Sequence, residues 1–358
     1  MTGLLPEGFH DRLPPFADAA ARLERGVLDV ARSYGYEQVD PPLAEYEDGL
    51  ARRLKAGGVR DAVRFVDPVS QKSLAIRPDI TAQVARIAAT RMAHHPRPVR
   101  LSYAGTVLKL RATQLRPERA LRQMGFELIG LDNVAAAAEV VAVAVEALTA
   151  AGLRGVSVDF TLPDLVATLG GGGALAAALD SKDAGEVAAI DSNFLPLIEA
   201  AGPFDAAIAR LRAHDAGGTL ASRLDGLAAI AAGLPEGTGM TLDPTERHGF
   251  EYQSWFGFSL FADGARGEIG RGGSYTVLHE TGREEAAVGV TLYADPMLEA
   301  LGSETERRRL FLPAGTAAER GAVLRAQGWV TVAALTDDDT PAAQLCTHVL
   351  GAEGPVVA

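Results

Sequence analysis

The sequence predicts a mixed α/β fold, and three patterns support this prediction. Residues 100–130 read as two β-strands joined by an arginine-rich loop. Residues 16–34 carry apolar side chains at helical spacing. Residues 155–161 read as a further strand, directly after a helical stretch at 134–151. We therefore expect a β-sheet that is flanked by helices.

The first strand of the 100–130 pair has one polar face. Leu108 and Leu110 alternate with Lys109 and Arg111, which is the period-two pattern of a strand with a buried and a polar side. Both cations are therefore expected to point the same way.

The second strand has a polar face with a gap in its middle. Apolar residues at positions 124, 126 and 128 share one side, which leaves Gln123, Gly125 and Glu127 on the other. Four strand residues span about 13 Å, so the Gln123 amide and the Glu127 carboxylate could bracket a small polar ligand. Gly125 would let that ligand lie close to the backbone. A solvated sheet face with a packing glycine explains the same spacing equally well.

The elements before this pair follow in order. The helix at 16–34 leads into a strand at 36–40, which ends before Pro42, a residue that cannot donate to a strand ladder. Two short strands are expected at 63–66 and 73–76. Apolar residues at 80, 84 and 87 then mark one face of a helix that begins near Asp79. An acidic residue at that position interacts favourably with the helix dipole, so capping alone explains Asp79.

The elements after the pair suggest an interrupted core. Residues 165–235 are rich in alanine and glycine, and their periodic pieces have helical spacing. An aromatic-rich strand is expected within 250–261, a further strand at 286–292 and a helix at 295–301. Alternating short strands and helices occupy 308–350. We therefore divide the chain into a core (1–162), a helical insertion (163–238), the continued core (239–303) and a small α/β C-terminal module (304–358).

Composition narrows the class of protein. A chain of 358 residues with a formal net charge of −12 has no basic footprint for a nucleic-acid backbone. The single cysteine, Cys346, excludes an intrachain disulfide framework and suits a reducing compartment. The sequence shows no membrane-spanning run, signal peptide or metal-ligand spacing. We expect a cytoplasmic protein with no metal, no cofactor and no nucleic-acid partner.

Two segments resemble a known family. Residues 103–130 resemble motif 2 of the class II aminoacyl-tRNA synthetases, in particular the histidyl enzyme, without gaps. Residues 35–48 resemble motif 1, which builds the dimer interface in that superfamily, with Pro42 at the position of its proline. A still closer resemblance is to the regulatory subunit of ATP phosphoribosyltransferase, a synthetase-like protein of histidine biosynthesis without synthetase activity. The resemblance implies a class II synthetase-like antiparallel sheet and a dimer.

The resemblance also implies a histidine site. In the histidyl family, residues that match Asp79 and Thr81 hold the amino group of histidine, and an ammonium group needs such acceptors. Those that match Gln123 and Glu127 hold the imidazole. Tyr252, in the words Gly-Phe-Glu-Tyr, and Tyr275, in Gly-Arg-Gly-Gly-x-Tyr, would help to enclose the ligand. A role in the core with satisfied hydroxyl groups also explains both tyrosines, and Tyr252 is the better candidate of the two.

The positions that hold the phosphates of ATP in the enzymes have changed. Lys109 and Arg111 stand where a histidyl synthetase has Arg-x-Glu, and lysine is not equivalent to arginine there. His248 replaces the activating arginine, and a neutral imidazole cannot supply that charge. Asp295 and Pro296 stand where motif 3 ends in Glu-Arg. Catalytic residues are therefore predicted to be absent. Gln253, where the enzymes often have a second tyrosine, predicts a changed affinity for histidine.

Three functions remain open from the sequence. The first is a non-catalytic regulatory subunit that activates the short-form catalytic subunit of ATP phosphoribosyltransferase and mediates feedback inhibition by bound L-histidine, as a homodimer within a hetero-oligomer. The second is a divergent adenylate-forming enzyme that uses Lys109, Arg111 and Arg116 to contact an anionic phosphate. The third is an amino-acid-binding module with another partner. The retained pocket and the lost cations together favour the first.

Overall fold

The computed structural model describes residues 5–51, 62–111, 118–247, 253–302 and 308–358. The chain forms two compact units, Met1–Ser303 and Glu304–Ala358, and we describe each unit by itself. Among the helices that the structure describes, none has both the length and the apolar character that crossing a membrane needs.

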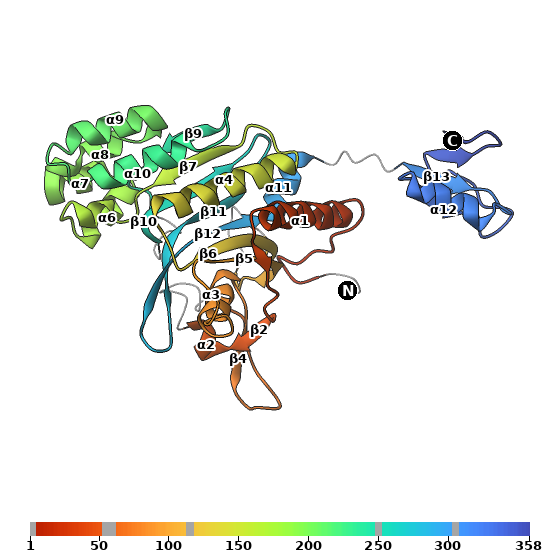
Figure 1. Ribbon diagram of the computed structural model, residues 1–358, viewed down its shortest axis with the longest axis horizontal. Coiled ribbons are helices and arrows are strands. Elements are labelled where there is room, and N and C mark those ends of the chain that lie inside the picture. The colour runs from red at the N-terminus through yellow and green to blue at the C-terminus, as the bar shows by residue number, and fades with distance from the viewer. Residues whose placement is uncertain (1–4, 52–61, 112–117, 248–252, 303–307) are drawn as a thin grey trace. The chain divides into compact units, whose positions relative to one another are not determined.

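A nine-stranded mixed sheet forms the centre of the first unit (Figure 1). Its strand order is β1-β5-β6-β12-β11-β10-β7-β9-β8. The contacts from β5 through β7 are antiparallel, whereas β1 joins β5, and β9 joins β7, in parallel. The strands are β1 (Glu37–Gln38), β5 (Val99–Leu108), β6 (Ala120–Ile129), β7 (Ser157–Thr161), β8 (Gly202–Pro203), β9 (Gly239–Leu242), β10 (Gln253–Phe261), β11 (Gly270–Leu278) and β12 (Glu284–Tyr293).

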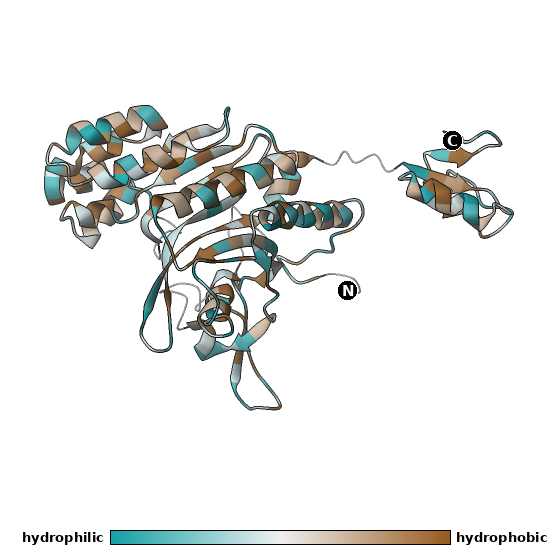
Figure 2. Cartoon of the chain, in the orientation of Figure 1, coloured by the Kyte–Doolittle hydropathy of each residue, from teal (hydrophilic) through white to brown (hydrophobic). Residues whose placement is uncertain are grey.

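One face of this sheet carries the main hydrophobic core. Helices α1 (Phe16–Ser33), α4 (Val134–Ala150) and α11 (Ala294–Leu301) cover it, and Figure 1 shows α1 and α4 together on this side. Met124, Phe126 and Leu128 of β6 point into this core, as the period-two pattern predicts. The visible side of α1 is largely hydrophilic (Figure 2), because its buried residues form one stripe: Ala20, Leu23, Val27 and Ala31.

The opposite face of the sheet is covered by α3 (Thr81–Ala89), which packs on β5, β6 and β11. Ile80, Val84 and Tyr103 belong to the hydrophobic cluster on this side. A separate three-stranded sheet, in the order β2-β4-β3, lies next to α2 (Glu47–Ala51). Its strands are β2 (Ala44–Tyr46), β3 (Arg64–Val66) and β4 (Ser73–Ile76). Figure 1 shows α3 and these strands on the side of the main sheet away from α1.

The segment between β7 and β9 is almost entirely helical. It contains α5 (Leu165–Thr168), α6 (Gly173–Asp180), α7 (Ala184–Asp191), η1 (Ser192–Phe194), α8 (Pro196–Glu199), α9 (Phe204–His214) and α10 (Ala221–Ala232). The buried side chains of this segment join the main core. Helix α10 packs on α4, so the helices extend the helical layer of the first unit.

The C-terminal unit has its own sheet and core. The strand order is β14-β13-β15-β16, and α12 (Ala318–Ala326) packs on β14. The strands are β13 (Arg309–Leu312), β14 (Val330–Ala333), β15 (His348–Leu350) and β16 (Pro355–Val357). Leu310, Leu312, Leu324 and Leu350 form its hydrophobic cluster. Cys346 is buried here as a free thiol.

Two strand predictions need correction. Strand β5 ends at Leu108, so Lys109 and Arg111 lie beyond it and Leu110 is 36% exposed. Just beyond the end of β5, the Lys109 N–H donates a backbone hydrogen bond to the Arg119 carbonyl at 2.8 Å. Strand β1 contains only Glu37–Gln38 rather than 36–40. Tyr36 packs its ring edge-on against Phe126 in the main core, with ring centroids 5.2 Å apart.

Candidate ligand-binding site

Five elements bring polar side chains together on the face of the main sheet that α3 covers. We call these residues the acceptor cluster because carboxylate, amide and hydroxyl oxygens dominate it. Gln123 and Glu127 come from β6, and the other members come from the turn before α3, from α3 itself and from β5, β11 and β12. The full set is Asp79, Thr81, Tyr103, Gln123, Glu127, Tyr275 and Thr291.

Gln123 connects β6 by hydrogen bonds to the turn that precedes α3. Its amide oxygen accepts from the Ile80 N–H at 3.1 Å, and its amide nitrogen donates to Asp79 Oδ2 at 2.8 Å. The same nitrogen donates to Thr291 Oγ1 at 3.2 Å. Because Ile80 N–H can only donate and a carboxylate accepts, these neighbours fix which end of the amide carries the oxygen. Gln123 is fully buried, so the polar face of β6 is not a solvated surface.

Glu127 is a buried carboxylate held by two phenols. Tyr103 donates to its Oε1 at 3.1 Å, and Tyr275 donates to its Oε2 at 2.9 Å. The pKa of Glu127 is raised to about 8, mainly by burial and to a smaller extent by the nearby Asp79, while the bonds from Tyr275 and Tyr103 oppose the shift. Gly289 of β12 is paired with Glu127 in the strand register, and a Cβ atom at Gly289 would overlap the carboxylate.

Asp79 and Thr81 stand at the start of α3. The Thr81 N–H donates to Asp79 Oδ1 at 2.8 Å, so Asp79 bonds to the first residue of α3 although the N-cap position itself is held by Ile80. The other Asp79 oxygen faces Gln123, and the Thr81 hydroxyl lies 3.1 Å from the Tyr103 hydroxyl. The structure therefore places the predicted ammonium acceptors next to the predicted imidazole acceptors.

Sequence reasoning missed Tyr103 and Thr291. Both stand opposite Gly125 in the strand register, one on β5 and one on β12. A Cβ at Gly125 would lie 2.6 Å from the Tyr103 hydroxyl oxygen. The space above this glycine therefore holds the Tyr103 phenol, which corrects the expectation that a ligand lies directly on it. The sequence carries no signal for either residue, because their register with Gly125 is set by strands that are far apart along the chain.

The cavity at the cluster is small. Thr81, Glu127, Tyr275 and Thr291 are among its lining residues, with Arg271 from β11, and its volume is about 10 Å³. This is room for about one water molecule. Larger hollows of about 840 Å³ and 430 Å³ lie beside α2 and beside α1. The convergence of hydrogen-bonded acceptors, rather than the volume, distinguishes the cluster as a candidate site.

The other predicted residues lie elsewhere. Lys109 is half-buried and Arg111 is exposed, and neither lines the cavity at the cluster. Asp295, at the start of α11, pairs with Arg12, so its carboxylate has a structural partner. Three of the residues singled out in the sequence fall outside the described residues: Tyr252, Arg116 and His248. Within the described residues, His, Cys, Asp and Glu side chains form no group of three that could hold a metal ion.

Comparison with known proteins identifies the family. A family model described as histidyl-tRNA synthetase matches residues 8–297. An ATP phosphoribosyltransferase regulatory subunit from Paramagnetospirillum magneticum is 43% identical over 373 residues, which cover 99% of this chain and 97% of that protein. The chain belongs to the ATP phosphoribosyltransferase regulatory subunit family. A second such subunit, from Rhodospirillum centenum, is 43% identical and covers 93% of this chain and 89% of its own.

The solved structures agree with this family on the fold. A Bacillus halodurans crystal structure, described as an ATP phosphoribosyltransferase regulatory subunit/histidyl-tRNA synthetase, superposes with a TM-score of 0.81. It is 22% identical and covers 96% of each chain. The class II synthetase-like fold and the regulatory class that the motifs predict are therefore confirmed. The roles of the individual cluster residues stay predictions.

Proposed function

We propose that this regulatory subunit of ATP phosphoribosyltransferase, a protein of histidine biosynthesis, senses L-histidine at the acceptor cluster. It activates the short-form catalytic subunit when histidine is absent and transmits feedback inhibition when histidine is bound. Asp79 and Thr81 receive the α-ammonium group, and Gln123 and Glu127 receive the imidazole ring. Tyr275, together with Tyr252, encloses the ligand. The protein itself performs no chemical step.

The observation that carries the proposal is a pair of carboxylates that share one cluster with a buried amide. Asp79 comes from the turn before α3 and Glu127 from β6, and Gln123 donates to Asp79. Histidine at neutral pH offers N–H donors at both ends, an ammonium group and an imidazole, so its donors complement these acceptors. Burial makes the charged form of Glu127 costly, so a ligand that brings further N–H donors to this side chain gains an energetic advantage.

The closed state of the cluster supports a regulatory role. With a cavity of about 10 Å³, the side chains of the cluster bond to one another. Histidine must replace contacts such as the bond from Gln123 to Asp79, which connects β6 to α3. A ligand inhibits a partner only if it binds the inhibited arrangement more tightly than the active one. The bond between β6 and α3 is a place where the two arrangements can differ.

The decisive experiment measures the catalytic subunit. Its rate is followed alone, with this chain, and with this chain plus L-histidine, using wild type, Glu127→Gln and a control, Glu139→Gln. Glu139 is a partly buried glutamate on α4, bonded to Arg100 at 2.7 Å and 2.8 Å on the other face of the sheet. We expect Glu127→Gln to activate the catalytic subunit as wild type does. The histidine concentration that it needs for inhibition should rise roughly tenfold or more.

Each alternative result has a definite meaning. Unchanged inhibition in Glu127→Gln, with normal inhibition in Glu139→Gln, would place the histidine site elsewhere. If folded wild-type protein neither activates the catalytic subunit nor responds to histidine, the regulatory proposal is wrong. Histidine-dependent exchange of pyrophosphate into ATP then tests the alternative of a divergent adenylate-forming enzyme.

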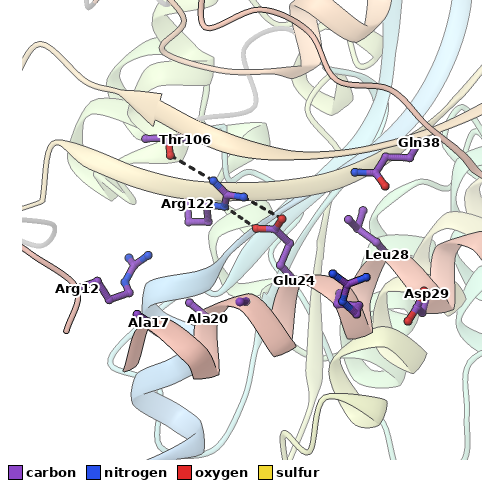
Figure 3. Close-up of a pocket in the computed structure, with 11 residues that line it drawn as sticks. Arg12, Ala17, Ala20, Glu24, Leu28, Asp29, Gln38, Thr106 and Arg122 are labelled. Atoms are coloured by element: carbon purple, nitrogen blue, oxygen red, sulfur yellow. Dashed lines mark hydrogen bonds and ion pairs between the residues drawn. The ribbon is translucent and has the colours of Figure 1, made fainter. Parts of the chain in front are cut away.

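We also propose that two copies of the chain pair through the α1 side of the sheet within the hetero-oligomer. Strand β1, from the segment that resembles motif 1, ends the sheet at this edge. Next to it lies a groove of about 430 Å³, lined by α1 and by Gln38, Thr106 and Arg122 (Figure 3). Arg122 donates to Glu24 across the groove at 2.8 Å.

Light scattering of wild type and of the variant Arg25→Glu tests this pairing. Arg25 is an exposed residue of α1. A wild-type dimer that becomes monomeric in the variant supports the proposed interface.

A further inference from the structure

Tyr103 stands at the centre of the acceptor cluster, although nothing in the motifs marks it. Its hydroxyl lies within hydrogen-bond distance of three side-chain oxygens: Glu127 Oε1 at 3.1 Å, Thr81 Oγ1 at 3.1 Å and Thr291 Oγ1 at 3.0 Å. The side chain is fully buried, and burial raises the pKa of the phenol, which therefore keeps its proton.

The direction of the hydrogen bonds is fixed from one end. The Ile80 N–H occupies the Gln123 oxygen, so the amide nitrogen must face Asp79 and Thr291. Because Thr291 Oγ1 accepts from this nitrogen at 3.2 Å, its own proton is available for the Tyr103 oxygen. Tyr103 is then left to donate its single proton to Glu127 Oε1. The bonds thus run in one direction, from Ile80 to Glu127.

A phenol oxygen can accept two hydrogen bonds and donate one. Thr291 and Thr81 supply the two protons that Tyr103 accepts, and Glu127 takes the one that it donates. All three are in use, so Tyr103 has no capacity left for a ligand. Its effect must pass through its neighbours, which include one side chain from each half of the site, Thr81 and Glu127.

We propose that Tyr103, supported by Thr291, is a positioning residue that couples the two halves of the site and holds Glu127 as an acceptor for the ligand's ring N–H. This inference rests on the proposed histidine site and deepens it. According to this inference, the site selects ligands with an N–H donor on their ring because the hydrogen bonds from Thr291 to Tyr103 and from Tyr103 to Glu127 hold the carboxylate in place. A ligand whose ring offers an N–H donor satisfies Glu127, whereas a ring without one leaves this carboxylate in need of a donor.

The groups that face the Glu127 carboxylate define what a titration reports. Among the described residues, Asp79 faces it from the turn before α3, Tyr103 from β5, and Tyr275 and Arg271 from β11. Strand β12 contributes Gly289 and Thr291, which do not titrate. Asp79 raises the pKa of Glu127, whereas the phenols stabilise its charged form. Removing the Tyr103 hydroxyl therefore moves the pKa of Glu127 upward.

The test is a calorimetric titration with L-histidine from about pH 6 to about pH 9, a range that spans the ionisation of Glu127. It compares wild type, Tyr103→Phe, Thr291→Val and the control Tyr36→Phe. Tyr36 is also a buried tyrosine, and it donates to Glu139 at 3.0 Å from the other face of the sheet. The variants differ from wild type by the loss of one hydroxyl, with a methyl group in its place in valine.

We expect Tyr103→Phe to weaken binding roughly tenfold and to shift the pH transition of the affinity upward. Thr291→Val also weakens binding. The double variant loses less binding free energy than the sum of the two single losses, because both residues belong to the same series of hydrogen bonds. Tyr36→Phe leaves affinity and transition unchanged. Wild-type affinity in Tyr103→Phe would overturn the inference, as would a loss of affinity without a shift of the transition, which indicates a merely structural role.

Failure of the proposed function is distinguishable from failure of this inference. If wild-type protein does not bind histidine at any pH, the proposed site is wrong. The assignment of Tyr103 is then read from the pH dependence of urea unfolding without ligand. There Tyr103→Phe must extend the pH range over which Glu127 stays protonated in the folded protein, and an unchanged range overturns the inference.

Discussion

Glu127 is an ionisable side chain with only 1% of its surface exposed, and the fold meets the cost of burying it by local means. Two phenols donate to its oxygens, and a glycine on the next strand leaves the space that its carboxylate fills. Hydrogen bonds from neutral donors compensate only part of the lost hydration, so the pKa remains raised to about 8. A ligand that brings further donors would complete the compensation.

The raised pKa of Glu127 makes the stability of the protein depend on pH. An unfolded glutamate has a pKa of about 4.3, and the folded value is about 8. Between these values the folded protein holds a proton that the unfolded chain has released. The free energy of unfolding therefore falls as pH rises, by up to about 1.4 kcal/mol per pH unit from this group.

The measurement is urea denaturation at several pH values within this window. The fall in unfolding free energy should be shallower in Glu127→Gln than in wild type, because the amide does not titrate. In Glu139→Gln it should match the wild type, because Arg100 holds the pKa of Glu139 below its ordinary value, outside the window. Equal slopes for wild type and Glu127→Gln would contradict the assignment of a buried, protonated Glu127.

Gly289→Ala tests whether the position of the carboxylate depends on a missing side chain. A methyl group there would overlap the Glu127 carboxylate, which could move aside only by breaking the hydrogen bonds from Tyr103 and Tyr275. We expect a loss of about 1–3 kcal/mol in unfolding free energy and no measurable histidine binding. Gly267→Ala is the control, because a Cβ there meets nothing within 4 Å. Normal histidine affinity in Gly289→Ala would show that Glu127 has room to shift.

At the scale of elements, the period-two pattern predicted the faces of β6 correctly but not where its partner ends. A shift of one residue would have moved Phe126 out of the main core and onto the face that α3 covers, so the hydrophobic pattern determines the face. The end of β5 depends on where pairing stops, and Leu110 continues the alternation beyond that point. Alternation alone therefore cannot locate a strand terminus.

The sequence predicted only part of the acceptor cluster, because some of its residues come together only through the register of the strands. Gln123 and Glu127 are polar residues in an apolar pattern, so they stand out in the sequence. Tyr103 lies within a run of buried strand residues and reads as core. Its role depends on the register with Gly125 and Thr291, which are far apart in the sequence. Strand β11 was also not predicted, because its glycine-rich start does not read as a strand; in the sheet Gly272 allows close approach to Phe258 and the Gly289 carbonyl.

Helix α4 offers a prediction at the same scale. Asn133 caps it, since its side-chain oxygen accepts from the Ala136 N–H at 3.0 Å. Asn133→Ala leaves this N–H without its partner and should lower the free energy of unfolding by about 1 kcal/mol. Asn133→Asp keeps the acceptor and should remain close to wild type. Equal losses in both variants by urea denaturation would mean that the amide has another role.

At the scale of the whole molecule, the two units have separate cores. The clusters that hold the main sheet between its helices belong to Met1–Ser303, whereas the cluster around Leu310 belongs to Glu304–Ala358. The acceptor cluster lies entirely in the first unit. A unit with its own core is expected to fold independently. The proposed histidine site should therefore depend on the first unit alone.

Truncation after Ser303 tests this directly. We expect the 1–303 chain to fold cooperatively and to bind L-histidine with the affinity of the full chain, because every described cluster residue and its packing partners are present. Circular dichroism through a thermal transition and calorimetric titration provide the two measurements. A truncated chain that folds but binds at least tenfold more weakly would show that the C-terminal unit contributes to the site. Preserved binding with lost activation of the catalytic subunit would instead assign that unit to contact with the partner.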